Sequence, residues 1–387
     1  MAGTPGVRSV SVVGIGQVPV RKAWPESLRQ LGIRALGRAM EEAGIDRVDS
    51  LVVGNMLADE LQGQKHLATL LADEAGLSGI EAMEARAATA SGAAALRLAY
   101  LTVASGEADL AAALGVEKMS EGVATPALAK ALDAEKEVAR GASLIGRNAE
   151  LLRLYLERYR LAGDALVQFP VHAHRNARSN EHALFHGRVG PREVRKSRLV
   201  YPPLRLLDCA PICDGAAAVI LAPTDQARAY TERPVRLLAS SVATDRMRIE
   251  DRSDPLRLEA VEASTRAALR LANVHRADIR VYELHDAFSI MACLSLEAAG
   301  YAEPGRGWRL AEEGRIGLRG EIPISTFGGL KARGHPIGAT SLYQVCEIVL
   351  QLTGRAGRNQ VRNASVGMQQ SVGGVASTAV THIFAAP

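Results

Sequence analysis

Residues 84–96 read EARAATASGAAAL, and residues 328–340 read GGLKARGHPIGAT. In both stretches a turn of small residues leads into a segment that is too apolar to face water. We therefore expect buried helices over residues 93–104 and 342–352. Two halves of one chain that share this unusual element point to a duplicated structural unit.

The segments around these two stretches repeat the same order of elements. In each half an apolar strand is followed by an amphipathic helix and then by a second strand, which is typical of α/β proteins. The first helix is expected to start near Pro25 and to stop at Gly44, and its counterpart to start at Asp254 and Pro255. We predict an α/β fold built from a duplicated unit, with the two buried helices packed between sheets. The expected strands are 9–14, 50–54, 110–115, 216–222, 235–242, 279–284, 363–367 and 377–384.

Residues 118–205 interrupt the repeat with polar, charged and histidine-bearing segments. We predict an N-terminal half formed by residues 1–117 and 206–232, an inserted loop domain at 118–205, and a C-terminal half at 233–387. A basic run in the insertion either faces solvent or contacts an anion such as a phosphate group. The run comprises Arg188, Arg192, Arg195, Lys196 and Arg198.

Length and composition exclude several classes of protein. The 387 residues exceed what one hydrophobic core usually organises. The net charge of +4 is the difference between 46 basic and 42 acidic residues, so nothing favours nucleic acid or a membrane surface as a partner. The start, MAGTPGVRSVSVVGIG, does not resemble a signal peptide, and no apolar stretch approaches the about 20 residues of a membrane span. We expect a cytoplasmic protein that acts on small molecules.

The four cysteines lack CxxC spacing and have apolar neighbours, so we expect buried thiols rather than disulfides or metal ligands. They are Cys209, Cys213, Cys293 and Cys346.

Two further motifs are too weak to indicate a function. The segment VGIG at 13–16 follows a strand, but the third glycine of a dinucleotide-binding loop would fall at Pro19. Four histidines in the insertion suggest a metal site, although no carboxylate stands at the HExxH spacing. We expect a plain strand end in the first case, and solvent-facing histidines without a metal in the second. These histidines are His172, His174, His182 and His186.

The stronger signals lie in the small-residue turns and at one strand end. Pro336 fixes the chain beside His335, and the glycines around it, such as Gly328 and Gly329, let the backbone approach a ligand closely. His285 directly follows a predicted strand, at the carboxyl end where open α/β sheets bind their ligands. The two histidines are therefore expected to converge.

Thr89 stands at the mouth of the first buried helix, at the same place as Thr340 in the second half. The dipole of such a helix favours negative charge at this end. Structural roles stay open as well, a helix cap for Thr89 and a hydrogen-bonded buried side chain for His335.

The segments EARAATASGAAAL, ELHDAF at 283–288 and GGLKARGHPIGAT resemble the three signature segments of the thiolase family. CDGAAAVILAP at 213–223 is similar to the strand that closes a thiolase's first half, and the insertion resembles the family's loop domain. The His-Asp form at His285 is similar to the sterol-carrier-type and archaeal branches. The resemblance implies a duplicated, five-layered αβαβα fold that binds CoA thioesters, with no metal and no cofactor besides coenzyme A as a substrate.

Three positions depart from the family's pattern. Thr89 takes the place of the nucleophilic cysteine, Ser371 that of the C-terminal cysteine that moves protons, and Ser325 that of an asparagine. A thiol ionises far more readily than a threonine hydroxyl, which needs a strong, positioned base before it can attack a thioester. Covalent catalysis is therefore expected to be impaired in this chain.

The resemblance implies that Thr89, His285 and His335 are the catalytic residues. The histidines, together with backbone donors, would hold a thioester oxygen while negative charge develops on it. The expected substrate-binding residues are Gly328, Gly329, Gly373, Gly374, Ser325 and Arg188.

The predicted function is acyl transfer on 3-oxoacyl-CoA or acetyl-CoA, by thiolysis or by Claisen condensation. Two alternatives stay open. One is a non-covalent enzyme that acts on acyl-CoA, either a lyase of the retro-aldol type or a hydrolase. The other is a catalytically silent subunit of a multienzyme complex that binds acyl-CoA. The resemblance further implies a homodimer or homotetramer that pairs through the strand at 110–115, and a small zinc-ribbon/OB-fold partner protein is a further hypothesis.

Overall fold

Strands from both halves of the chain form one nine-stranded sheet in the computed structural model, which describes residues 7–387. The strand order is β3-β2-β4-β7-β1-β8-β11-β10-β9, and a separate two-stranded sheet is formed by β5 and β6. Residues 1–6, which the predicted N-terminal half includes, lie outside the described part of the chain. The strands are β1 (Val10–Gln17), β2 (Ser50–Gly54), β3 (Glu81–Ala85), β4 (Ala111–Lys118), β5 (Leu199–Tyr201), β6 (Leu204–Arg205), β7 (Asp214–Pro223), β8 (Val235–Thr244), β9 (Val281–Glu283), β10 (Val366–Gly373) and β11 (Thr378–Ala385).

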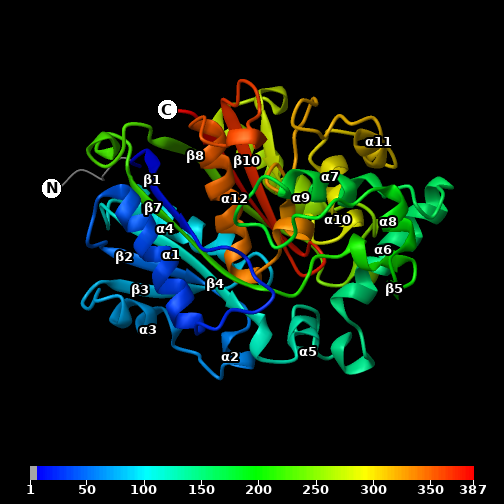
Figure 1. The fold of residues 1–387 in the computed structure, drawn as a ribbon, viewed down its shortest axis with the longest axis horizontal. Helices are drawn as coiled ribbons and strands as arrows, with labels where there is room; N and C mark the ends of the chain where they lie inside the picture. Colours follow the sequence, from blue (N-terminus) through cyan, green and yellow to red (C-terminus); the bar gives the residue numbers. More distant parts are fainter. Residues whose placement is uncertain (1–6) are drawn as a thin grey trace.

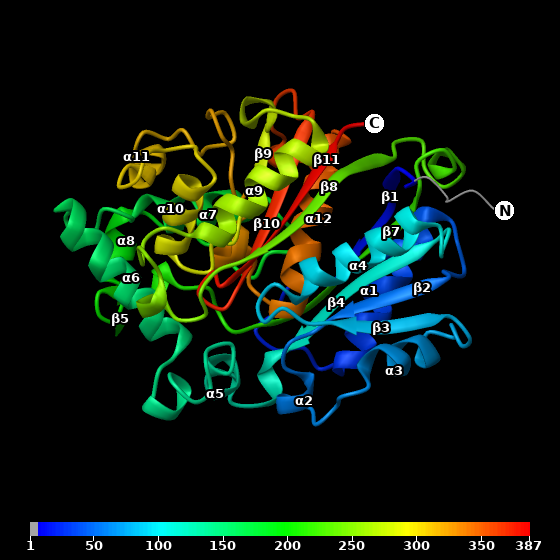
Figure 2. The same ribbon diagram turned by 180° about the vertical axis from the view of Figure 1, so that it is seen from behind.

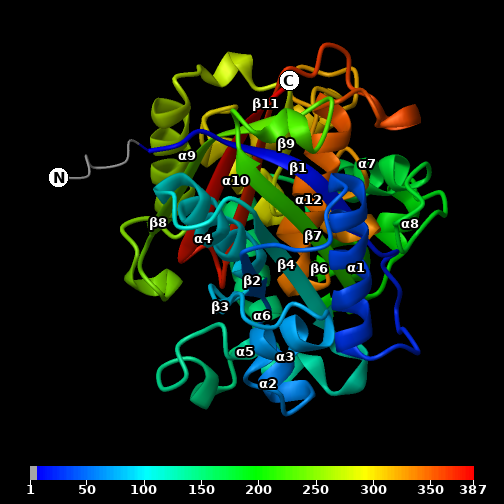
Figure 3. The same cartoon turned by 90° about the vertical axis from the view of Figure 1, so that its left-hand side faces the viewer.

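Two buried helices separate the strands of the N-terminal half from those of the C-terminal half (Figures 1 and 2). Helix α4 (Ser91–Ser105) contacts β2 and β4 on one side and β8, β10 and β11 on the other, and α12 (Ile337–Leu352) contacts β4 and β7 as well as β9 and β10. Helix α1 (Leu28–Ala43) covers the outer face of the first group of strands, and α9 (Glu259–Ala272) that of the second (Figure 3). The predicted αβαβα layering is confirmed.

The alternation along β7 shows how one strand serves two layers. Ala216 and Ala218 pack in the core beneath α1, whereas Ala217 and Val219 pack in the core around α12. Both faces of this strand are therefore buried away from solvent, which explains its unbroken apolar sequence. The two groups of strands are joined where residues 10–12 of β1 pair with residues 235–237 of β8, so the sheet is continuous through three residue pairs.

The amphipathic outer helices start later than their sequence patterns indicate. Helix α1 begins at Leu28 because Ser27 is its N-cap and accepts a hydrogen bond from the Gln30 amide, and it ends at Gly44, which has a φ of 66°. Helix α9 begins at Glu259, so the expected start at Asp254 and Pro255 is wrong. The Asp254 carboxylate instead accepts the Leu256 amide in a turn before the helix.

Four glycines let the amino ends of α4 and α12 meet. A Cβ on Gly338 would lie 2.6 Å from the Gly54 carbonyl oxygen, and a Cβ on Gly92 or Gly115 would lie 2.4 Å from the Gly338 carbonyl oxygen. A Cβ on Gly54 would lie 2.7 Å from the Cα of Gly92. Only glycine permits this backbone approach, which brings the turn before α4 close to the turn before α12.

The strand expected to mediate pairing of subunits is not at an edge of the sheet. Strand β4 lies between β2 and β7, and all of its residues are buried. Because both of its hydrogen-bonding edges are occupied, the prediction that chains pair through residues 110–115 is wrong. The edges of the sheet are β3 and β9.

The insertion forms a helical region beside the C-terminal half (Figure 1). The three-part division of the chain predicted from the sequence stays a prediction. Within residues 7–387, no helix is both long and apolar enough to cross a membrane. The remaining helices are α2 (Ala58–Leu61), α3 (Leu67–Glu74), α5 (Ala124–Ala129), α6 (Leu144–Tyr159), α7 (Gln168–Ala177), α8 (Pro191–Lys196), α10 (Ser289–Ala298) and α11 (Gly307–Glu312).

Candidate active site

A cavity of about 410 Å³ lies where both halves and the insertion meet, and its wall contains Thr89, His285 and His335. The three residues come from the turn before α4, the segment after β9 and the turn before α12. The structure thus brings together the three side chains that the sequence predicts to be catalytic. Apolar side chains form much of the remaining wall, among them Leu128, Leu144, Ile145, Phe288, Met291 and Ile337.

His335 is held from two sides in the turn that precedes α12. Its backbone N–H donates to the sulfur of Cys213 over 3.1 Å, and its Nδ1 lies 2.7 Å from the hydroxyl oxygen of Thr340. Burial raises the pKa of the Cys213 thiol to about 12, so this sulfur stays protonated and neutral. With Nδ1 occupied, Nε2 is the ring nitrogen of His335 that is left for the cavity.

His285 meets His335 edge to face, with ring centroids 5.1 Å apart and an interplanar angle of 86°. The Nδ1 atom of His285 is buried and has no hydrogen-bond partner within residues 7–387, so Nε2 is again the nitrogen left for a ligand. Burial lowers the pKa of His285 to about 4. Burial, with the nearby His285 and Arg333, holds the pKa of His335 well below its usual value. Both imidazoles are therefore neutral at pH 7.

Thr89 donates its hydroxyl proton to the carbonyl oxygen of Val372 over 2.6 Å. The preceding Ala88 has a φ of 50°, a conformation that non-glycine residues rarely adopt, and it shapes the sharp turn that presents Thr89. A carbonyl oxygen is not a base, so this contact does not activate the hydroxyl. Thr89 is 5% exposed and reaches the cavity, but the structure leaves it an alcohol rather than an alkoxide.

Asp286 is part of a clamp that fixes the segment carrying His285. Its carboxylate accepts the Leu330 amide over 2.8 Å and pairs with the Lys331 ammonium over 3.1 Å, while Lys331 also donates to the Asp286 carbonyl. A Cβ on Gly329 would lie 2.5 Å from this carboxylate. Gly329 thus makes room for the clamp and does not line the cavity, and Gly328 packs with a φ of 109° against α7.

The other predicted substrate-binding residues lie in different surroundings. Gly374 lines the cavity, whereas Gly373 gives space to the Ala87 carbonyl, from which a Cβ would lie 2.5 Å. Ser325 is buried outside the cavity wall with a φ of 44°. Arg188 is exposed between α7 and α8, away from the wall. Contact of these residues with a substrate stays a prediction.

Ser371 does not face the cavity. Its hydroxyl lies 2.8 Å from that of Ser341 on α12 and accepts from Gln369, so it belongs to a buried polar network between the sheet and α12. The neighbouring Val372 and Gly374 line the cavity instead.

The expectation that the histidines of the insertion face solvent is wrong for His172 and His174. Both are 4% exposed, and Nε2 of His172 lies 3.1 Å from the Ile324 carbonyl oxygen. His186 is exposed, as predicted. Across residues 7–387, no three His, Cys, Asp or Glu side chains group as metal ligands.

Several residues that shape the site were not identified from the sequence. The sequence places Thr340 as the counterpart of Thr89, but α12 begins at Ile337, so Thr340 lies inside the first turn of the helix and holds His335. For Cys213 the sequence predicts only a buried thiol. Arg198, one member of the basic run, lines the mouth of the cavity. Its place among the five residues of the basic run gives no means of singling it out.

A carboxylate inside the core joins α12 to the N-terminal half. Glu117, at the end of β4, accepts the Gly338 amide over 2.9 Å, the Met56 and Leu57 amides, and the Asn55 side chain. Burial raises its pKa to about 7. This contact lies directly behind the turn that carries His335, so Glu117 supports the position of that turn.

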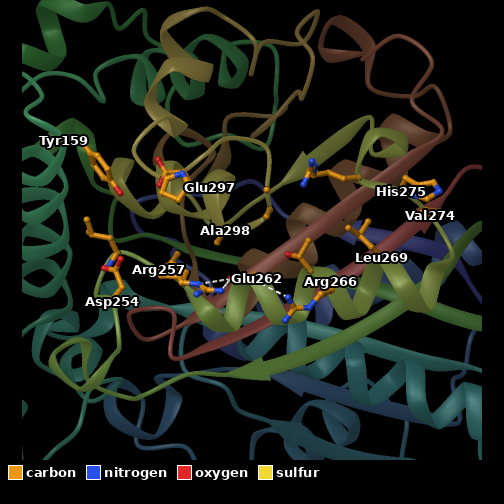
Figure 4. A pocket seen from close by; sticks show the side chains of 17 residues that line it. Tyr159, Asp254, Arg257, Glu262, Arg266, Leu269, Val274, His275, Glu297 and Ala298 are labelled. Atoms are coloured by element: carbon orange, nitrogen blue, oxygen red, sulfur yellow. Dashed lines mark hydrogen bonds and ion pairs between the residues drawn. The ribbon is translucent and has the colours of Figure 1, made fainter.

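A second cavity, of about 570 Å³, lies beside α9 and the end of α10 (Figure 4), and neither His285 nor His335 lines it. Three of its charged side chains pair with one another, since Arg257 and Arg266 both contact Glu262, over 2.8 and 3.2 Å. Although this cavity is larger, none of the predicted catalytic residues lines it. The first cavity is therefore the candidate active site.

Two family models match most of the chain, and related proteins align with nearly all of it. Residues 14–200 match the model of the thiolase N-terminal domain, and residues 241–386 match that of the thiolase C-terminal domain-like family. The chain is 42% identical over 381 residues to an acetyl-CoA acetyltransferase of Methanothermobacter thermautotrophicus, covering 98% of this chain and all of that protein. It is 30% identical to human sterol carrier protein 2, covering 95% of this chain and 70% of that protein.

Solved structures show the same fold at lower identity. An Ltp2-ChsH2(DUF35) aldolase superposes with a TM-score of 0.84 at 20% identity, covering 98% of each chain. Human mitochondrial 3-ketoacyl-CoA thiolase superposes with a TM-score of 0.75 at 16% identity, covering 98% of this chain and 99% of that one. With both halves matched by family models and one relative aligned from end to end, the chain belongs to the thiolase family.

Proposed function

We propose that the protein is an acyl-CoA acyltransferase of the thiolase type, which cleaves or forms the bond between the α-carbon and the 3-carbonyl of a 3-oxoacyl-CoA. The observation that carries this proposal is the pair of neutral imidazoles, His285 and His335, beside Thr89 in one cavity. Its end-to-end likeness to an acetyl-CoA acetyltransferase supports the same activity.

In this proposal the residues of the site have complementary tasks. Neutral His335 accepts the proton of the attacking group at Nε2. His285 donates a hydrogen bond from its Nε2 to a thioester oxygen as negative charge develops there. The amino end of α4 points its positive dipole toward the same place, beside Thr89. The apolar wall excludes water and strengthens these interactions.

We propose coenzyme A thioesters as the ligands and no further cofactor. Arg198 is exposed at the mouth of the cavity, where a phosphate group on the entering ligand would meet it. Calorimetry with coenzyme A is expected to show binding that weakens with added salt and with Arg198→Met. Arg192→Met, a change in the same run but off the cavity wall, is expected to bind as the parent does.

Thr89 favours a second candidate, a lyase that forms no acyl-enzyme. Because the hydroxyl proton is directed at the Val372 carbonyl and not at a base, the structure does not prepare an alkoxide. Retro-aldol cleavage of a 3-hydroxyacyl-CoA needs only a base for the 3-hydroxyl proton and a stabilised enolate. The two histidines and the α4 amino end supply both.

One assay distinguishes the two candidates. The protein is incubated with acetoacetyl-CoA and coenzyme A, and separately with a 3-hydroxyacyl-CoA, and the products are separated by chromatography. Acetyl-CoA from the first mixture, lost in His335→Ala, supports acyl transfer. Cleavage only in the second mixture supports the lyase, and binding of coenzyme A without either product supports a silent subunit. A small zinc-ribbon/OB-fold partner is tested by repeating the assay with such a protein added.

A further inference from the structure

Thr340 lies completely buried in the first turn of α12, directly behind the ring of His335. Its hydroxyl oxygen lies 3.0 Å from the carbonyl oxygen of Pro336 and 2.7 Å from Nδ1 of His335. No other atom within residues 7–387 forms a hydrogen bond with either ring nitrogen of His335. The orientation and protonation of this ring therefore depend on one hydroxyl group.

Counting protons decides the direction of both contacts. A threonine hydroxyl carries one proton and two lone pairs, whereas a carbonyl oxygen can only accept. The hydroxyl therefore donates to Pro336, in the i−4 contact common for threonine in a helix. Toward His335 its oxygen has only a lone pair to offer. Nδ1 must then carry the proton of the neutral ring.

We propose that Thr340 is a positioning residue that holds His335 in the Nδ1–H tautomer, so that Nε2 faces the cavity as a proton acceptor. The catalytic meaning of this tautomer rests on the proposed function. In the opposite tautomer an N–H would point into the cavity, and the neutral ring would donate a proton where the reaction needs a base.

The same protein contains a natural reference for the opposite tautomer. Nε2 of the buried His382 lies 3.2 Å from the carbonyl oxygen of Ala93, which can only accept, so His382 carries its proton on Nε2. Burial lowers the pKa of His382 to about 3, so this ring is neutral under the same conditions as His335. The two residues should therefore give opposite patterns in one spectrum.

The test is nitrogen NMR of the full-length protein labelled with ¹⁵N-histidine at pH 7, which reports the protonated nitrogen of each ring directly. The chain has nine histidines, and the signals of interest are assigned by their loss in His335→Gln and His382→Gln. We expect a proton on Nδ1 of His335 and on Nε2 of His382. The unaltered protein answers this question without any change at Thr340.

Two variants then test the role of Thr340. Thr340→Ser keeps the hydroxyl and is expected to keep the Nδ1–H tautomer. Thr340→Val keeps the shape but removes the acceptor, and it is expected to move His335 toward Nε2–H while leaving His382 unchanged. We expect Thr340→Val to lower kcat by about 10-fold or more with little change in KM, and Thr340→Ser to restore it.

The outcomes separate this inference from the proposed function. A proton on Nε2 of His335 in the unaltered protein, or an unchanged tautomer in folded Thr340→Val, overturns the inference. The predicted tautomers in a protein without activity on any acyl-CoA leave the inference standing and contradict the proposed function instead. Thermal unfolding of each variant shows whether it is folded, and if Thr340→Val unfolds, the parent spectrum and Thr340→Ser decide the question.

Discussion

His285 and His335 show how burial prepares side chains for chemistry. An exposed histidine is partly protonated near its pKa of about 6.5, but these two rings lose their solvation in the cavity and stay neutral to a much lower pH. A neutral ring at pH 7 can accept a proton without first losing one. The fall of kcat/KM on the acidic side should therefore occur at a lower pH than for an exposed histidine.

We expect kcat/KM to stay nearly constant from about pH 8 down to about pH 5. It should fall only as the pH approaches about 4, the pKa of His285. The rate is the better measurement than stability, because buried carboxyls such as Glu117, with a pKa near 7, shift stability in the opposite direction from the histidines as the pH falls. An acidic limb centred near 6.5, in protein whose circular dichroism is unchanged there, would contradict this account.

The clamp between Asp286 and Lys331 leads to a prediction for stability. Lys331→Met keeps much of the side-chain volume but leaves the buried Asp286 carboxylate without its cation. We expect the free energy of unfolding to fall by about 3–5 kcal/mol, measured by denaturant titration. Lys22→Met, at an exposed position, should change it by less than about 0.5 kcal/mol. Equal effects of both changes on the free energy of unfolding would show that the ion pair between Asp286 and Lys331 does not stabilise the protein.

The sequence alone predicts the three residues at the centre of the site but not what holds them. His285, His335 and Thr89 follow apolar strands or precede buried helices, and such positions can be recognised from local patterns. Thr340 and Cys213 act through contacts with His335 that depend on where α12 starts and on chain segments more than 100 residues apart. No local pattern contains that information.

At the scale of elements, the approach of α4 and α12 determines whether the site forms. Gly338→Ala would place a methyl group 2.6 Å from the Gly54 carbonyl and push the start of α12 away. We expect a loss of about 1–3 kcal/mol in the free energy of unfolding and a drop in kcat, since His335 moves with the helix.

Gly37→Ala is the matched control. Gly37 lies on the exposed side of α1 with no atom within 4 Å of an added Cβ. There the change should stabilise the protein by about 0.5–1 kcal/mol, because alanine favours the helix, and leave activity unchanged. A Gly338→Ala protein with parental stability and kcat would show that the glycine contact does not position the site.

Element types were predictable, whereas element starts and sheet positions were not. The apolar runs of β4 and β7 indicate strands buried on both faces, and the structure confirms them. The same composition cannot show that β4 is central in the sheet, because pairing with β2 and β7 is a long-range property. The glycines before α12 predict a helix that starts at Leu342, but the helix begins five residues earlier, at Ile337.

At the scale of the whole molecule, one edge of the sheet suits pairing of two chains. Among residues 7–387, strand β3 pairs in the sheet with β2 alone, and its Met83 is 40% exposed. We expect a symmetric homo-oligomer by light scattering, and dissociation toward single chains in Met83→Lys. Leu271→Lys, a change of an exposed leucine on α9, should leave the assembly intact. Single chains at micromolar concentration in the parent would contradict the prediction.

The most direct test of acyl transfer at this site is to supply the missing nucleophile. Thr89→Cys places a thiol at the amino end of α4 in the cavity that contains neutral His335, which can take its proton. The variant and the parent are incubated with acetoacetyl-CoA and examined by intact mass, with Thr89→Cys/His335→Ala as the control. We predict one acetyl group on the Thr89→Cys protein, none on the parent, and little on the control. A folded Thr89→Cys protein that binds coenzyme A yet gains no acetyl group would contradict the account.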